Sequence, residues 1–69
     1  MKEGGYIMGL ATMINNTRYK EDIFNFLRDH SASYFTESEL NEALNMIGKN
    51  PYNFNTKDEK LQALIDYYR

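Results

Sequence analysis

The sequence predicts an all-α fold, a compact three-helix core with a short N-terminal fourth helix or extended segment. Valine is absent from the 69 residues, although a sheet core normally draws on β-branched residues. Three segments also combine a helical apolar period with signals for helix ends. Since the chain has no internal repeat, linker or low-complexity tract, we expect a flexible N-terminus over residues 1–5 and a single helical domain over residues 6–69.

The best-signalled helix runs from Thr36 to Ile47. Thr36 and Glu39 have the spacing of a capping box, and Phe35 with Leu40 has that of a hydrophobic staple. One apolar stripe at i, i+3, i+4 and i+7 follows, made of Leu40, Ala43, Leu44 and Ile47. Gly48 then favours a left-handed helix end.

Two further helices are predicted from the same kinds of signal. The segment from Thr56 to about Tyr68 has a second capping box at Thr56 and Glu59. Its apolar stripe is Leu61, Leu64, Ile65 and Tyr68. A helix over about 18–29 has Thr17 or Asn16 as its cap and early acidic residues. Its stripe is Tyr19, Ile23, Phe26, Leu27 and His30.

The remaining segments are expected to connect and close this core. Residues 6–15 have helical apolar spacing and predict a short helix, with a strand as the alternative. We expect a polar connector over 31–33, a short extended stretch at 34–35, and a loop over 49–55 whose Tyr52 and Phe54 plug the core. The predicted core is Ile14, Tyr19, Ile23, Phe26, Leu27, Phe35, Leu40, Leu44, Ile47, Phe54, Leu61, Leu64, Ile65 and Tyr68.

Composition and motifs argue against catalysis, so we predict a protein that is not an enzyme and takes no cofactor. There is no Cys and only one His, His30, which we expect to be a structural residue at a helix end. Without such ligands, Glu39 and Glu42 are expected to form a solvated face rather than a metal site. No nucleophile elbow, phosphate loop or zinc-protease motif is present.

The N-terminal apolar stretch predicts neither a secretory signal nor membrane binding. Residues 6–14 are largely apolar but lack a cleavage site and a basic face, and no run approaches 18 apolar residues. We therefore expect a cytoplasmic protein. Phe, Tyr, Met, Ile, Asn and Lys have AT-rich codons and are abundant, which indicates a low-GC bacterium or one of its phages or plasmids.

Charge is distributed unevenly along the chain. The net charge of −2 divides into +1 over residues 1–18, −4 over 19–48 and +1 over 49–69. The chain also has more apolar side chains than so small a core encloses. The first hypothesis is therefore a small regulator or inhibitor that binds another protein, or a second copy of itself, through an apolar-plus-acidic helical surface. Its candidate residues are Glu21, Asp22, Glu37, Glu39, Glu42 and Met46.

The alternative hypothesis is a DNA-binding regulator. The stretch from Ile23-x-x-Phe26-Leu27 to Phe35-Thr36-x-x-Glu39-Leu40-x-x-Ala43-Leu44 resembles the front half of a winged helix-turn-helix domain. The last helix also offers Lys57 and Lys60 at i and i+3 together with Gln62, which are suited to phosphate and base contacts. The candidate contacts are Lys49, Lys57, Lys60, Gln62 and Arg69. The isoelectric point near 5.2 favours the protein-binding hypothesis, because DNA-binding domains are typically strongly basic.

Overall fold

The computed structural model describes residues 9–69 of the chain, and among them it contains helices but no strand. The predicted all-α fold is thus confirmed. In order, the elements are α1 (Leu10–Asn16), α2 (Lys20–Arg28), the 3₁₀ helix η1 (Ala32–Tyr34), α3 (Glu37–Met46), the 3₁₀ helix η2 (Pro51–Asn53) and α4 (Lys57–Tyr68). The expectations for residues 1–5 and for residues 6–8 lie outside the described residues.

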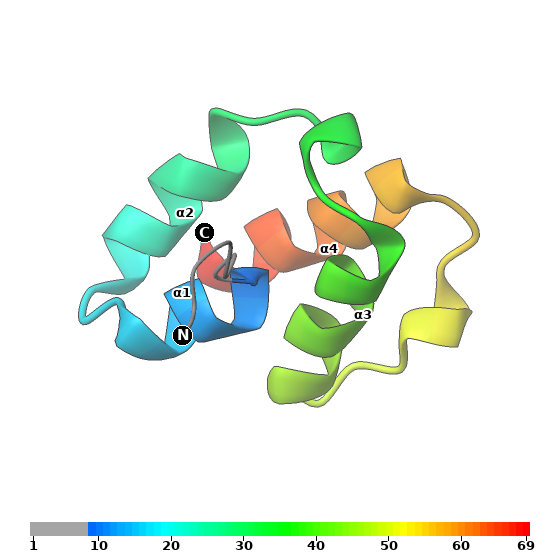
Figure 1. Cartoon of the computed structure of the whole chain (residues 1–69), viewed down its shortest axis with the longest axis horizontal. Helices are drawn as coiled ribbons and strands as arrows, with labels where there is room; N and C mark the ends of the chain where they lie inside the picture. The colour runs from blue at the N-terminus through cyan, green and yellow to red at the C-terminus, as the bar shows by residue number, and fades with distance from the viewer. Residues whose placement is uncertain (1–8) are drawn as a thin grey trace, which may run out of the picture.

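The last helix is the centre of the arrangement. Figure 1 shows α2 and α3 on either side of α4, and α4 packs against both of them. Helix α1 packs against α3, while η1 contacts α4 and η2 contacts α3. Because α4 has neighbours on two sides, much of its circumference is covered.

One hydrophobic core joins all four α-helices. Its fully buried large side chains are Leu27 of α2, Leu40 and Leu44 of α3, and Leu64 of α4. Of the predicted core, Tyr19 alone is wrong, because its side chain is exposed; the others are buried or packed against the core. Leu10, Ala32 and Ala43 are also buried. The short α1 is thus an integral part of the core through Leu10 and Ile14.

Helix α3 begins and ends as its residues predict. The Thr36 hydroxyl accepts a hydrogen bond from the Glu39 amide at 3.1 Å, and the Glu39 carboxylate accepts one from the Thr36 amide at 2.7 Å. At the other end Gly48 has φ +79°. The Lys49 amide donates to the Leu44 carbonyl at 2.9 Å, which is the bond of a Schellman motif.

Helix α4 has only half of its predicted capping box. The Thr56 hydroxyl accepts from the Glu59 amide at 3.1 Å, as expected. However, the Glu59 carboxylate accepts from the amide of Asn55, at 2.8 Å, rather than from Thr56. The carboxylate therefore holds the residue before the cap and ties the connector to the first turn of α4.

The start of α2 differs from the prediction. Neither Thr17 nor Asn16 caps it; the helix begins at Lys20 after Tyr19, which makes no side-chain capping bond. The physical reason is that the Thr17 hydroxyl donates back to the Met13 carbonyl at 2.7 Å, at the end of α1. The side chain of Tyr19, as the residue before α2, is directed into solvent and not into the core.

The two connectors are more ordered than the sequence indicated. Residues 31–33 are not a simple polar connector, because Ala32 is buried and starts η1, which also takes in Tyr34. Phe35 is extended, as expected. In the second connector only Phe54 packs against the core, whereas Tyr52 is 84% exposed. The expected plug is thus Phe54 alone, with buried Pro51 beside it.

Candidate functional site

Lys60 is removed from the candidate nucleic-acid contacts by its environment. The residue is only 3% exposed, and its ammonium donates to a Glu37 carboxylate oxygen at 3.0 Å and to the Asn41 side-chain oxygen at 2.6 Å. These bonds join α4 to α3. An ammonium held in this way is a structural link between helices, and the residue cannot reach a phosphate while α3 and α4 stay packed.

The six candidate protein-binding residues do not form one surface. Glu21 and Asp22 are exposed in the first turn of α2, while the other four residues belong to α3. Helices α2 and α3 lie on opposite sides of α4 (Figure 1). Glu37 faces Lys60. Burial of the apolar stripes against α4 thus separates acidic groups that are close in the sequence.

Three of the six do share one face, which we call the α3 stripe: Glu39, Glu42 and Met46. Their i, i+3 and i+7 spacing places them on one side of α3. Glu42 and Met46 are exposed, and Glu39 is half-buried. Glu39 also lies at a hollow of about 410 Å³ beside α1, whose other described lining residues are Gly9, Leu10, Met13, Phe26, Tyr34, Phe35 and Thr36. The stripe is therefore acidic and adjoins an apolar depression.

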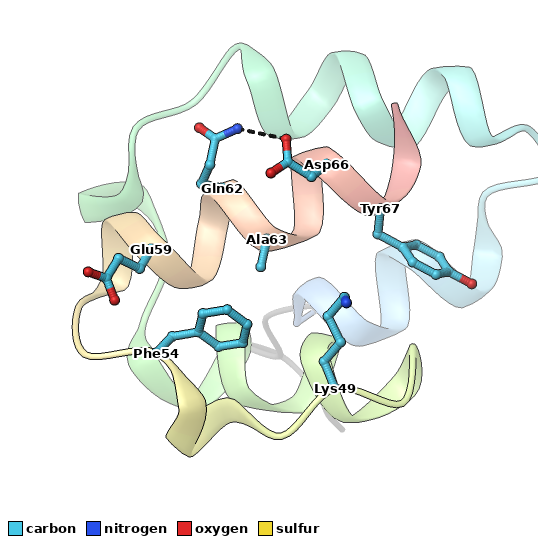
Figure 2. A pocket seen from close by; sticks show the side chains of 7 residues that line it. All are labelled: Lys49, Phe54, Glu59, Gln62, Ala63, Asp66 and Tyr67. Carbon is cyan, nitrogen blue, oxygen red and sulfur yellow. Dashed lines mark hydrogen bonds between the residues drawn. The ribbon is translucent and has the colours of Figure 1, made fainter.

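A second depression, which we call the α4 groove, lies between α4 and the connector that precedes it. It has a volume of about 510 Å³ and is lined by Lys49, Phe54, Glu59, Gln62, Ala63, Asp66 and Tyr67 (Figure 2). Five of these residues belong to α4, and all of them except Ala63 are exposed. Phe54, Ala63 and Tyr67 make part of the lining apolar, and Tyr67 is 49% exposed.

Asp66 is the centre of a small polar network at the edge of the α4 groove. One of its carboxylate oxygens accepts from the Arg69 guanidinium at 2.9 Å and from the Gln62 amide at 3.0 Å. These two bonds, that from Arg69 foremost, favour the charged carboxylate and lower the pKa of Asp66 below its ordinary value of 3.8. The groove therefore has a carboxylate that stays ionised at neutral pH, with a guanidinium beside it.

The candidate nucleic-acid contacts are only partly brought together. Lys49 and Gln62 line the α4 groove, and Arg69 is joined to it through Asp66. Lys57 is elsewhere, at a separate hollow beside Ser31 and Ser33. With Lys60 buried, the predicted basic set is not one continuous surface.

His30 has a structural environment. Its Nδ1 donates to the Phe26 carbonyl at 2.6 Å, and its ring lies 4.3 Å from the ring centres of both Phe26 and Tyr34. The imidazole thus closes the end of α2 over an aromatic cluster. Across residues 9–69, no three His, Cys, Asp or Glu side chains are grouped so that they could hold a metal ion. No helix in that part of the chain is long and apolar enough to cross a membrane.

The α4 groove includes residues that were not among the predicted site residues, namely Glu59, Ala63, Asp66 and Tyr67. A signal for them was present, because these positions together with Gln62 recur at i, i+3, i+4, i+7 and i+8. That pattern marks the face opposite the buried stripe. It becomes a groove only because Phe54 and Lys49 of the connector stand beside it (Figure 2).

Comparison with known proteins gives no relationship to argue from: no protein-family model, no curated protein and no solved structure matches this chain.

Proposed function

We propose that this chain is a small non-enzymatic regulator or inhibitor that binds another protein through the α3 stripe and the hollow beside it. The observation that carries the proposal is the position of Glu39 at a hollow otherwise lined largely by apolar groups, among them Leu10, Met13 and Tyr34. Glu42 and Met46 extend the same face of α3. We place this activity in the cytoplasm of a low-GC bacterium, with the gene carried by the bacterium itself or by one of its phages or plasmids.

The chemistry of the surface indicates the kind of partner. Apolar side chains provide affinity when they are buried against a partner, and carboxylates at the margin favour a partner of opposite charge. The α3 stripe has two carboxylates and, among its three residues, no cation. The expected partner surface therefore presents apolar side chains flanked by Lys or Arg.

Affinity capture with matched charge reversals tests the proposal. The full chain is immobilised and exposed to a lysate of a low-GC bacterium, beside the variants Glu42→Lys and Glu21→Lys. Both variants make the same chemical change on an exposed helical position, but only Glu42 belongs to the α3 stripe. A partner retained by wild type and by Glu21→Lys, and reduced about tenfold or more by Glu42→Lys, is the expected result.

Two outcomes would contradict the proposal. Equal loss with both variants would mean that capture depends on net charge and not on the α3 stripe. Retention unaffected by Glu42→Lys and by Met46→Ala would place the contact elsewhere on the molecule.

DNA binding is the second candidate, favoured by Lys49, Gln62 and Arg69 around one groove. The same groove also holds the carboxylates of Glu59 and Asp66, which repel phosphate. A gel-retardation assay at about 50 mM salt, where phosphate contacts are strongest, decides between the candidates. We expect no shift; a shift that weakens with salt and with Lys49→Glu would favour DNA binding instead.

A further inference from the structure

The α4 groove has a cation, Lys49, and a carboxylate, Glu59, at separate positions along it, while its second carboxylate, Asp66, is already bonded to Arg69 and Gln62. Figure 2 shows the Glu59 carboxylate at one end, beyond Phe54, and the Lys49 ammonium nearer the other end, toward Ala63 and Tyr67. One carboxylate oxygen of Glu59 accepts a hydrogen bond from the Asn55 amide, which holds the Glu59 side chain at its end of the groove. Lys49 follows the left-handed Gly48, and its backbone amide is bonded to α3, which fixes the point from which its side chain extends.

This arrangement matches itself under a two-fold rotation. In an isologous interface the same patch of two copies meets, so that residue i contacts residue j and residue j contacts residue i. A cation at one end and an anion at the other satisfy that rule, because each then faces its opposite. The α3 stripe offers no such match, because its two charged groups, Glu39 and Glu42, are both carboxylates.

The apolar groups of the groove support the same occupant. Tyr67 is 49% exposed at the margin of the groove, and Phe54 and Ala63 line it. Tyrosine is enriched at the centres of protein interfaces. In a pair of copies, the Tyr67 ring of each one packs into the α4 groove of the other. A 69-residue chain also buries a smaller fraction of its surface than a larger domain does, so pairing adds apolar burial that the single copy lacks.

We propose that the α4 groove is occupied by a second copy of this chain, in a two-fold dimer in which Lys49 pairs with the partner's Glu59. The pair occurs twice, once on each side of the axis. Asp66, held by Gln62 and Arg69, borders the interface. This interface is separate from the α3 stripe, so a dimer presents two copies of the proposed protein-binding surface.

Sedimentation velocity on the full chain tests the proposal. We expect a monomer mass of 8.2 kDa at low concentration and twice that mass as the concentration rises. Lys49→Glu alone or Glu59→Lys alone makes every facing pair repulsive, and we expect each to raise the dimer dissociation constant about tenfold or more. In an equimolar mixture of the two variants every facing pair is again attractive, so the mixture should recover dimers that neither variant forms alone.

Matched controls separate dimerisation from folding and from the proposed function. Lys20→Glu makes the same change as Lys49→Glu at an exposed position of α2 and should leave the dimer intact. Lys49 is exposed on a connector, so its reversal should leave the helical circular dichroism unchanged. Glu42→Lys, which tests the α3 stripe, should leave the sedimenting mass of the dimer unchanged.

The proposal is overturned if the wild type stays at the monomer mass up to about millimolar concentration, the upper range of weak self-association. It is also overturned if a dimer forms but ignores both reversals, or if mixing the two variants restores nothing. A monomer whose α4 groove instead binds a different protein, lost on Lys49→Glu, would assign the groove to another occupant.

Discussion

The buried ammonium of Lys60 leads to an asymmetric prediction about stability. Replacing its acceptors should cost more than replacing the lysine itself. Lys60→Met keeps an unbranched apolar stem in the same space and removes the charge that needs partners. Glu37→Ala instead leaves the buried ammonium with Asn41 as its one remaining acceptor among the described residues.

The exposure of Glu37 and the burial of Lys60 set the size of the expected change in the free energy of unfolding. A hydrogen bond to a charged group contributes about 1.5–3 kcal/mol, and loss of one partner from a buried ion pair costs about 3–5 kcal/mol. Glu37 is 63% exposed at its side chain, so water screens its half of the pair and the cost falls around the lower end of the smaller range. We expect Glu37→Ala to lower the free energy of unfolding by about 1–2 kcal/mol, and Lys60→Met to change it by about 1 kcal/mol or less.

Urea unfolding followed by circular dichroism measures both values, and the double variant completes a cycle. In the Lys60→Met background, Glu37→Ala should have almost no effect, because the ammonium that required Glu37 is gone. The reasoning is refuted if Glu37→Ala costs the same in both backgrounds. It is equally refuted if Lys60→Met is the more destabilising of the two single variants.

Three further predictions follow from local geometry. The hydrogen bonds from Arg69 and Gln62 lower the pKa of Asp66. The ionised carboxylate therefore stabilises the folded protein above about pH 4, the unfolded pKa, and this stabilisation is lost as the pH falls through the folded pKa. Carbon-detected NMR titration of Asp66 should give a midpoint below 3.8. Burial, and to a smaller extent the neighbouring Tyr67, raises the pKa of Tyr68 above 10.0. The contribution of Tyr68 to the stability of the folded protein is therefore complete below about pH 10 and is lost as the pH rises through the folded pKa. Absorbance at alkaline pH should show one tyrosine that ionises late, and Tyr68→Phe should remove that step. Gly48 has φ +79° with open space around it, so Gly48→Ala should cost about 1 kcal/mol through the backbone alone and Gly48→Asn less, as compared by thermal unfolding.

Local signals in the sequence predicted the helix ends and the core correctly where the residues that interact are close together along the chain. The capping box at Thr36 and the Schellman end at Gly48 each join residues within five positions of one another. The apolar stripes of α2, α3 and α4 likewise identified most of the core. Such features depend on the helical period and on short hydrogen bonds, which the order of residues defines directly.

The same local rules were wrong where a competing partner was available. Thr17 has the right chemistry for a helix cap, but its hydroxyl bonds to the end of α1 instead of the start of α2. Tyr19 fits the apolar stripe of α2 by spacing, but it precedes the helix and is exposed. In both cases the sequence allowed two partners or two directions, and the packing of α1 and α2 selected between them.

By itself the sequence determined the all-α class, the start and end of α3 and most of the core, because burial of a helical stripe follows from its period. Only the tertiary structure decided which charged residues remain available. Packing buried Lys60 against Glu37 and brought Lys49 to the same groove as Glu59. It also placed the acidic residues of α2 and those of α3 on opposite sides of α4. Charges that are distant in the chain become neighbours only when the helices pack, so a list of charged residues does not define a binding surface.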